Sequence, residues 1–355
     1  MKRKRHLTKK AKIILFSMLT LILIIGIVVL VIIFSKDKKD NTPIPDNPEV
    51  PVVEEKKLNI INEDSNSRPI AVMINNIGVA RKYQTGLQDA YMVYEMIVEG
   101  GLTRLMAVYK DANTAKIGSI RSARHYYLDY ALESDAIYVH FGYSEYAQND
   151  IAKLGVNNLN GLIYDNVYFW RDKSLKVSSE HTAYSSIELI NQGITKLGYR
   201  TTTNVKPLLS YSVDALDLSS VPGVIPATSV DITYSKSMKT SYTYDEESKS
   251  YLRSVNGEAH TDFVTEKQNT AKNIITYQVQ NRTISGDIKG RQDLSTIGSG
   301  EGYYITEGVA VPITWSKDSR SAKTIYKLKD GTELKVNDGN TYIQIQPKGQ
   351  TLTIS

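Results

Sequence analysis

Residues 93–109 read VYEMIVEGGLTRLMAVY, and this stretch decides the fold of the region around it. Val93–Glu99 and Thr103–Tyr109 are alternating, strand-like segments. Gly100 and Gly101 stand between them, and glycine adopts the positive φ that a tight turn requires. The stretch therefore predicts a β-hairpin.

The flanking segments predict that this hairpin belongs to a sheet mixed with helices. Two strand-like runs and three segments of helical spacing surround it: Pro69–Asn75, Ala136–Phe141, Ser122–Leu132, Ser144–Leu154 and Ser185–Leu197. Ser122 stands where the first of these helices would begin, and serine is a favoured N-cap residue. We therefore expect a layered α/β domain with a mixed sheet over residues 68–205.

The chain becomes rich in strand-like runs after Pro222-Gly223. Three turn dipeptides separate these runs: Asn256-Gly257, Asp330-Gly331 and Asp338-Gly339. This pattern is typical of a meander, so we expect a small antiparallel sheet or barrel over residues 222–355. The predicted fold class is α+β, with a mixed α/β N-terminal domain followed by a β-rich C-terminal domain.

A long apolar run follows the basic start of the chain. Residues 1–12 hold seven Lys and Arg and no acid, and only Ser17, Thr20 and Gly26 interrupt the apolar side chains of residues 13–34. At about 1.5 Å per residue this run reaches roughly 33 Å, enough to cross a hydrocarbon core of about 30 Å. The run is longer than the apolar part of a cleaved signal peptide, which is one alternative; a buried core helix is the other.

The position of the basic residues predicts the topology of this segment. Because they precede the apolar run, the positive-inside rule places residues 1–12 in the cytoplasm as a stub. Residues 13–34 are then a transmembrane signal anchor, and the protein is a single-pass protein of the cell membrane whose bulk is extracellular. Residues 35–67 are charged and punctuated by proline, which is typical of an extended extracytoplasmic linker.

Charge and cysteine content exclude several classes of function. The net charge of +5 belongs to the N-terminal stub, because residues 41–355 carry 33 Lys and Arg against 36 Asp and Glu. The sequence therefore gives no basis for a nucleic-acid partner. The chain has no cysteine, which excludes disulfides, thiol chemistry, cysteine metal sites and a lipid-modified cysteine.

Two arginines flank Ser122 in the run IGSIRSAR over residues 117–124. Arg121 and Arg124 would stand at the start of the predicted helix, where free N–H groups favour an anion. Guanidinium also matches the geometry of phosphate and carboxylate groups. The run therefore predicts an anion site, and the alternative is that both arginines pair with internal acids such as Asp129, Asp135 or Glu99.

Other candidate site residues stand on the hairpin and in later loops. Glu99 and Arg104 lie on either side of the predicted turn, either as a cross-strand ion pair or as part of the same site. His140 ends an apolar strand, and His181 stands in a polar loop, so each is a candidate to line the cleft or to be a hydrogen-bonded structural residue.

The run FWRD ends in Arg171 and Asp172. It predicts either the aromatic edge of a pocket with a charge pair or a packed loop anchor. The sequence has no HExxH, EF-hand, GxSxG, SxxK or P-loop pattern, so we expect no metal and no cofactor.

Several ordered motifs resemble the YerB-like family of bacterial envelope proteins. They are RPIAVMINN (68–76), QTGL (84–87), VYE (93–95), VEGGLTR (98–104), IGSIRSAR (117–124), YFWRD (168–172), HTAYSS (181–186), GEAHTD (257–262) and WSK (315–317). The resemblance covers about residues 66–348. It implies an envelope location, often through a lipid anchor, and an α/β domain of unknown function followed by a smaller C-terminal domain.

The sequence departs from that family at three positions. The resemblance implies an acid at position 75 and at position 91, where this chain has Asn75 and Tyr91, and an asparagine at the position of Thr182. A weaker likeness in layout, a basic stub, one membrane helix and an exported domain with clustered arginines, is to the LytR–CpsA–Psr phosphotransferases.

Three functions follow as hypotheses. The first is binding of an anionic cell-wall component or an envelope protein through a cleft formed by the candidate residues Glu99, Arg104, Arg121, Ser122, Arg124, His140, Arg171, Asp172 and His181. The second is phosphoryl or glycosyl transfer on a lipid-linked or cell-wall polymer, in which the arginines would stabilise developing phosphate charge. The third is a scaffold that binds other envelope proteins through the C-terminal sheet.

Overall fold

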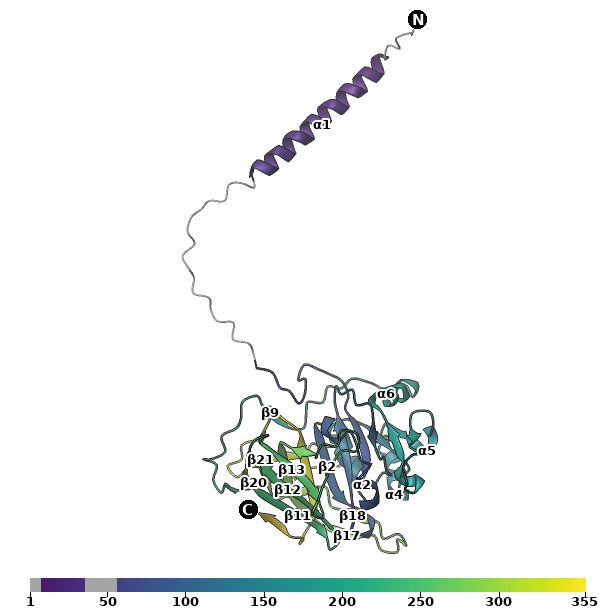
Figure 1. Ribbon diagram of the computed structural model, residues 1–355, viewed down its shortest axis with the longest axis vertical. Helices are drawn as coiled ribbons and strands as arrows, with labels where there is room; N and C mark the ends of the chain where they lie inside the picture. The colour runs from purple at the N-terminus through teal and green to yellow at the C-terminus, as the bar shows by residue number, and fades with distance from the viewer. Residues whose placement is uncertain (1–7, 36–55) are drawn as a thin grey trace. The chain divides into compact units, whose positions relative to one another are not determined.

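The computed structural model describes residues 8–35 and 56–355 (Figure 1). The chain divides into two units, of which the first ends at Glu55 and the second runs from Lys56 to Ser355. Residues 1–7 of the predicted stub and residues 36–55 of the predicted linker lie outside the described residues.

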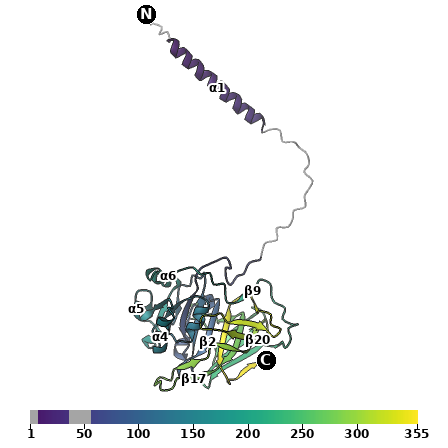
Figure 2. The ribbon, with the colours of Figure 1, turned by 180° about the vertical axis from the view of Figure 1, so that it is seen from behind.

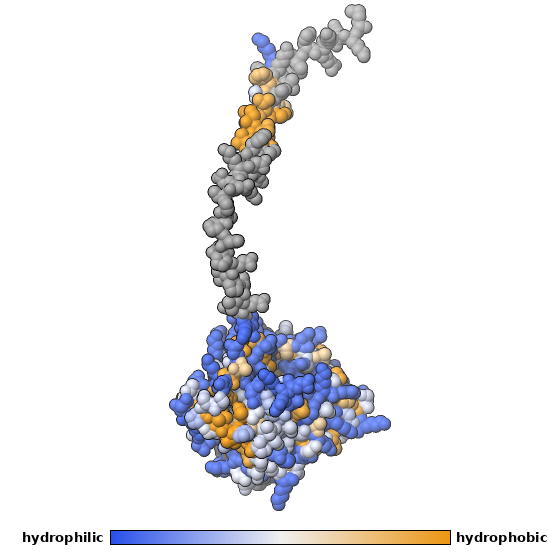
Figure 3. Space-filling view, turned by 60° about the vertical axis from the view of Figure 1, so that its left-hand side comes forward, coloured by the Kyte–Doolittle hydropathy of each residue, from blue (hydrophilic) through white to orange (hydrophobic). Residues whose placement is uncertain are grey.

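Helix α1 (Lys9–Ser35) belongs to the first unit. Its described side chains are mostly apolar and exposed, as Figure 3 shows. Among residues 8–35 and 56–355, no helix meets the length and hydropathy needed to cross a membrane. The span predicted over residues 13–34 therefore stays a prediction.

An eleven-stranded sheet forms the centre of the second unit. Its order is β10 (Ile225–Pro226), β20 (Val309–Lys317), β19 (Gly298–Thr306), β16 (Asn273–Val279), β23 (Thr341–Pro347), β2 (Met92–Ile97), β3 (Thr103–Tyr109), β1 (Ile70–Asn75), β5 (Ile137–His140) and β6 (Asn158–Asn160), with β21 (Ile325–Leu328) beside β20. Strand β1 is antiparallel to β3 and parallel to β5, so the predicted mixed sheet is confirmed.

The predicted hairpin is confirmed and forms the middle of this sheet. Strands β2 and β3 pair antiparallel, with Ile97 opposite Thr103. A short 3-10 turn, Glu99–Gly101, joins them, and both of its glycines have positive φ, 70° at Gly100 and 71° at Gly101. These dihedrals are those that only glycine adopts without strain, which explains the Gly-Gly dipeptide.

The C-terminal region is rich in strands, as predicted, and its strands are divided between two sheets. Strands between residues 229 and 354 form an antiparallel sheet of their own, as predicted, whereas β10, β16, β19, β20, β21 and β23 join the eleven-stranded sheet. Strand β23 lies between β2 and β16 and is parallel to both, so residues from both ends of the chain share one sheet. The predicted antiparallel meander is wrong for this strand. Thr341–Pro347 alternates apolar and polar residues, but all seven are buried, because Gln344 and Gln346 face a second layer rather than water.

That second layer is a six-stranded antiparallel sheet. It contains β14 (Glu258–Ala259), β13 (Ser250–Val255), β12 (Met238–Asp245), β11 (Ser229–Ser235) and β24 (Leu352–Ile354), with β15 (Thr270–Ala271) beside β13. The Tyr234 hydroxyl of β11 donates to Gln344 Oε1 at 3.0 Å, and Thr240 of β12 donates to Glu95 Oε1 at 3.1 Å. The second sheet therefore covers the face of β23 and β2 that carries Gln344 and Glu95.

Helix α3 (Tyr127–Glu133) covers the other face of β2. The Tyr94 hydroxyl donates to Glu133 Oε1 at 2.8 Å, and the rings of Tyr94 and Tyr130 lie 5.0 Å apart. Because successive side chains of a strand point to opposite faces, Tyr94 meets the helix while Glu95 meets the second sheet. Both faces of β2 are closed to water.

The remaining elements surround these layers. Helices α4 (Glu145–Lys153), α5 (Gly161–Tyr164) and α6 (Ile187–Lys196) lie at one end of the second unit, and β20 lies at the other (Figures 1 and 2). The smaller elements are α2 (Gly78–Arg81), the three-stranded sheet β4 (Ile117–Gly118), β8 (Ala183–Ser185) and β7 (Trp170–Arg171), and the pairs β22 (Lys335–Asn337) with β9 (Ser210–Ser212) and β17 (Asn281–Thr283) with β18 (Gln292–Leu294).

One predicted helix starts later than the sequence indicates. Helix α3 begins at Tyr127, and Ser122 is not its N-cap. Residues 120–124 are instead extended, because Ala123 N donates to the Gly142 carbonyl at 2.9 Å and Ala123 forms a bridge with Tyr143. Long-range pairing therefore overrides the local capping signal, and Arg121 and Arg124 do not stand at a helix N-terminus.

Candidate functional site

The extended segment 120–124 and the start of β3 bring three predicted arginines together. Arg104 is opposite Asn75 in the β1–β3 pairing, and Arg121 N donates to the carbonyl of Met73 on β1 at 2.9 Å. Both arginines therefore lie at the same edge of the sheet, where β1 ends. We call Arg104, Arg121 and Arg124 the arginine cluster.

Glu99 is shared by two members of the cluster. Arg124 Nε donates to Glu99 Oε1 at 2.5 Å, whereas the shortest approach of Arg104 Nη2 to Glu99 Oε2 is 4.0 Å. Burial alone would raise the pKa of Glu99, but the hydrogen bond and charge of Arg124, together with Arg104, lower it below its ordinary value. Glu99 is therefore a carboxylate held between two guanidiniums.

Glu180 is the partner of the third arginine. Arg121 Nη2 donates to Glu180 Oε2 at 2.7 Å, and Arg121 Nη1 donates to the Glu180 carbonyl at 3.0 Å. The hydrogen bond and charge of Arg121 lower the pKa of Glu180. The Glu180 side chain is 53% exposed, so this pair lies at the surface of the cluster.

His181 lies beside the same pair. Its Nδ1 is 2.9 Å from Asn75 Nδ2, and its Nε2 is 3.4 Å from Glu180 Oε1. An amide nitrogen only donates, so Nδ1 accepts and the ring proton of neutral His181 is on Nε2, toward Glu180. Burial, and after it the charge of Arg121, lowers the pKa of His181.

The cluster carries a surplus of positive charge. Three guanidiniums share two carboxylates, Glu99 and Glu180. Arg104 is the least compensated of the three: burial, and next the charge of Arg124, lower its pKa to about 9, although Glu99 acts in the opposite direction. An anion placed among these guanidiniums would relieve the repulsion between them.

Two of the other predicted residues lie close to the cluster. The Ser122 carbonyl accepts a hydrogen bond from Arg104 Nη1. The Arg171 guanidinium lies 4.0 Å from the centre of the Phe141 ring, bonds Asp165 Oδ2 at 3.2 Å and donates to the carbonyl of Ser179, the residue before Glu180. The aromatic ring that Arg171 contacts is therefore Phe141, which stands outside the run FWRD.

The structure does not bring His140 and Asp172 to the arginines. His140 is buried; its Nδ1 bonds the Gly142 carbonyl at 2.7 Å and its Nε2 lies 3.1 Å from Asn158 Oδ1. Burial lowers its pKa, as for a neutral structural histidine. Asp172 pairs with Lys116 at 2.9 Å and accepts from the Ser174 hydroxyl at 2.5 Å.

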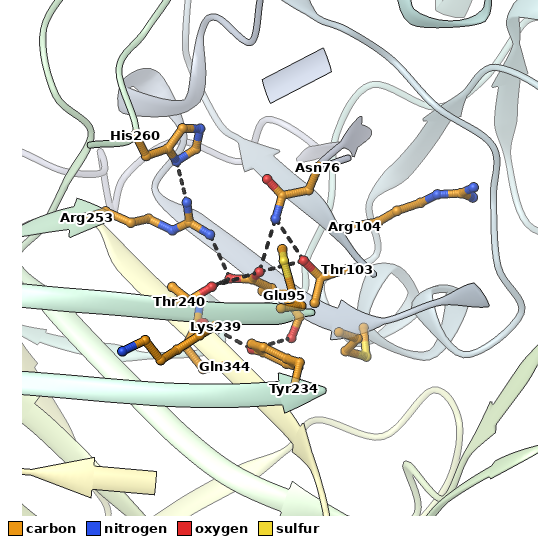
Figure 4. Close-up of polar contacts among 12 residues, drawn as sticks. Asn76, Glu95, Thr103, Arg104, Tyr234, Lys239, Thr240, Arg253, His260 and Gln344 are labelled. Atoms are coloured by element: carbon orange, nitrogen blue, oxygen red, sulfur yellow. Dashed lines mark hydrogen bonds and ion pairs between the residues drawn. The ribbon is translucent and has the colours of Figure 1, made fainter. Parts of the chain in front are cut away.

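A second cluster of charges was not predicted as a site from the sequence. Glu95 and Arg253 form an ion pair at 2.8 Å, and both side chains are completely buried between the two sheets (Figure 4). Arg253 also bonds His260 Nδ1. In Figure 4 the Arg104 guanidinium points away from this group, so the two clusters are separate.

The sequence feature that could have indicated this buried pair is Glu95, a lone acid in the apolar strand VYEMI. A similar pair, Glu133 with Lys317 at 2.9 Å, is also completely buried. Within residues 8–35 and 56–355, no three or more His, Asp or Glu side chains are grouped so that they could hold a metal ion.

Comparisons with known proteins extend over most of the chain. Two models of a protein of unknown function, DUF3048, match it: the N-terminal domain over residues 58–200 and the C-terminal domain over residues 230–343. YerB of Bacillus subtilis (strain 168), named as a candidate lipoprotein, is 30% identical over 291 residues, which are 81% of this chain and 84% of that protein. The crystal structure of YerB from Bacillus subtilis matches with a TM-score of 0.70 and 27% identity, over 81% of this chain and 94% of that chain. The chain therefore belongs to the DUF3048 family, in agreement with the resemblance to YerB-like proteins in its motifs.

Proposed function

We propose that this protein is an extracytoplasmic, membrane-associated protein that binds an anionic component or partner of the cell envelope through the arginine cluster. The relative YerB is named as a candidate lipoprotein, which supports a location at the membrane. The single-pass anchor over residues 13–34, with the N-terminus in the cytoplasm, is part of this proposal and rests on the basic residues before the run.

The observation that carries the proposal is the imbalance of charge in the cluster. Arg104 and Arg124 share one carboxylate, and Arg121 has its own in Glu180. A buried guanidinium without its own counter-charge is costly. Here the surplus is retained at the edge of the sheet, where a ligand can complete it.

The Arg121–Glu180 pair is the part of the cluster that a ligand can replace. Glu180 is more than half exposed, and an exposed ion pair is weak because water screens both charges. An anion that carries more charge than one carboxylate competes with Glu180 for Arg121. Phosphate and pyrophosphate also match the planar, two-pronged donor geometry of guanidinium.

Titration of the full chain with inorganic pyrophosphate tests the proposal. Isothermal titration calorimetry of the protein in neutral lipid nanodiscs should show saturable binding that weakens as salt is raised. Replacing Arg121 with Gln should weaken binding by about tenfold or more, because one charge-assisted contact is lost. Replacing Glu180 with Gln should tighten binding, because the internal competitor is removed.

Arg282 provides the matched control. It is an exposed arginine that pairs with Asp293 at 2.8 Å on the β17–β18 hairpin, outside the cluster. Arg282→Gln should leave the pyrophosphate affinity unchanged. Equal affinities for Arg121→Gln and Arg282→Gln, or no binding by the unmodified chain, would refute the proposal.

A further inference from the structure

An exposed apolar edge lies on and after helix α5. Leu162, Ile163 and Val167 are 61%, 68% and 57% exposed, and none of them belongs to the buried core. Water-exposed aliphatic side chains that stand together are a feature of interaction sites. We call these three residues the apolar edge.

The apolar edge adjoins the arginine cluster through Gly142. A Cβ placed on Gly142 would lie 3.3 Å from Ser122 Oγ and 3.4 Å from Leu162 Cδ1, so both side chains lie against this glycine. The Ser122 carbonyl in turn accepts from Arg104. Gly142 and Ser122 therefore connect Leu162 to Arg104.

Two further contacts hold the edge in this place. Asn160 Oδ1 accepts from the backbone N–H of both Gly142 and Leu162, each at 3.0 Å, which ties the start of α5 to the cluster. Gly161 packs so closely on the Phe141 ring that a Cβ would lie 2.1 Å from it, and the Arg171 guanidinium lies on the same ring at 4.0 Å from its centre.

The arginine cluster and the apolar edge therefore lie in one region and together indicate the class of ligand. We infer that the anion bound by the arginine cluster is the phosphate or pyrophosphate head of a single amphiphilic molecule whose apolar chain lies on the apolar edge. This inference rests on the proposed function, since it names the ligand of the same site.

Burial of the arginines favours one molecule over a membrane surface. The Arg104 and Arg124 residues are only 7% and 8% exposed, whereas the Glu180 side chain is 53% exposed, so the guanidiniums of Arg104 and Arg124 are recessed from the surface. The head groups of a flat bilayer remain in its plane and do not reach recessed groups. A head group at the end of a single chain can enter, while the chain stays on the surface.

Comparison of inorganic pyrophosphate with geranyl pyrophosphate tests this inference. Titrations use the full chain in neutral phosphatidylcholine nanodiscs, with geraniol as the probe for the chain alone. Geranyl pyrophosphate should bind at least tenfold more tightly than pyrophosphate. The double variant Leu162→Ser, Ile163→Ser should lose most of this difference while its affinity for inorganic pyrophosphate is unchanged.

The matched control is a second pair of exposed valines. Val79 and Val264 are 55% and 57% exposed but lie outside the apolar edge, so Val79→Ser with Val264→Ser should keep the tenfold difference. Equal affinity for the two pyrophosphates would overturn the inference and leave the proposed function standing. Absence of any pyrophosphate binding would overturn both.

A third titration tests whether the ligand is a single amphiphilic molecule or the surface of an anionic membrane. Nanodiscs that contain phosphatidylglycerol present anionic head groups in a plane. If these discs block pyrophosphate binding as effectively as geranyl pyrophosphate does, the ligand is the anionic bilayer surface and the inference is wrong. Unchanged pyrophosphate binding in these discs, at high enough salt to suppress bulk repulsion, supports the single amphiphile.

Discussion

The two charged clusters of the second unit differ in how deeply they are buried and in how their acids pair with arginines. In the first, Glu95 and Arg253 are both completely buried, and Glu95 also accepts from Asn76, Thr103 and Thr240. In the second, three guanidiniums share two carboxylates, and the Glu180 side chain is 53% exposed. Glu95 and Arg253 thus form a direct pair away from water, whereas in the second cluster two carboxylates serve three guanidiniums and one of the acids reaches the surface.

This difference shows which charges hold the fold together. Glu95 comes from the N-terminal half of the chain and Arg253 from the C-terminal half, and the same is true of Glu133 and Lys317. Burial alone would lower the pKa of Arg253, but Glu95 keeps it above its ordinary value. The Glu95–Arg253 pair therefore joins the two sheets, and the Glu133–Lys317 pair joins helix α3 to strand β20.

The largest effect is expected from Glu95→Gln. The change leaves the Arg253 guanidinium buried without a counter-charge, which costs about 3–5 kcal/mol of stability. Denaturant unfolding of the full chain, followed by tryptophan fluorescence, measures this loss. Pyrophosphate affinity of the protein that remains folded should not change, because Glu95 does not contact the arginine cluster.

The exposed pair Asp231–Lys239 is the control for this variant. Its atoms are 2.9 Å apart, as close as in the buried pair, but its side chains are 37% and 44% exposed. Asp231→Asn should therefore cost less than about 1 kcal/mol. A similar cost for Asp231→Asn and Glu95→Gln would mean that burial of the pair is not what makes it important.

The sequence predicts the local elements of this fold better than its long-range pairing. The β2–β3 hairpin follows from Gly100-Gly101, and helix α4 follows from its spacing, with Ser144 accepting from Ala147 N as its N-cap. Strand β23 could not be assigned to the centre of the sheet, because TYIQIQP has the alternation of a strand with one wet face. Its glutamines are buried only because the second sheet supplies Tyr234 and backbone carbonyls as partners.

The same limit applies to the site. The sequence indicates Arg104, Arg121 and Arg124 as candidates, but their clustering could not be predicted, because it depends on the pairing of Arg121 with β1 and of β1 with β3. The predicted position of Arg121 and Arg124 at a helix N-terminus is wrong, because Ala123 pairs with Gly142 and Tyr143. Nothing local distinguishes a serine that caps a helix from one that precedes an extended segment.

The variant Glu99→Gln should lose less stability than Glu95→Gln and should gain affinity for pyrophosphate. Loss of the carboxylate between Arg124 and Arg104 should lower stability by about 1.5–3 kcal/mol. Pyrophosphate affinity should rise, because the surplus of positive charge increases. Glu95→Gln should change stability alone, so the pair of variants separates a structural acid from one that competes with a ligand.

The pH dependence sharpens this prediction. The folded pKa of Glu99 lies below its ordinary value of 4.5, so its stabilisation is present above that value and is lost as the pH falls through the lower, folded pKa. Glu99→Gln should therefore lose less stability than the unmodified chain between neutral pH and acid. If the two proteins lose stability equally between neutral pH and acid, the proposed role of Glu99 is wrong.

The smallest effect is expected at His181, where Asn75 replaces the acid that YerB-like proteins are expected to carry. Burial and the charge of Arg121 hold the pKa of His181 below 6.5. The folded protein therefore binds fewer protons than the unfolded chain as the pH falls through 6.5, and stability decreases on acidification until the lower, folded pKa is passed.

Asn75→Asp should reverse this behaviour. Aspartate cannot donate to Nδ1 as the Asn75 amide does at 2.9 Å, so it favours a protonated Nδ1 and, with Nε2 facing Glu180, a doubly protonated ring. NMR titration of the His181 ring should show a raised pKa, with Asn62→Asp at an exposed position as the control. The added carboxylate and the cationic His181 cancel in charge, so pyrophosphate affinity at pH 6 should change little in Asn75→Asp. An unchanged pKa of His181 in this variant would contradict the role given to the Asn75 amide.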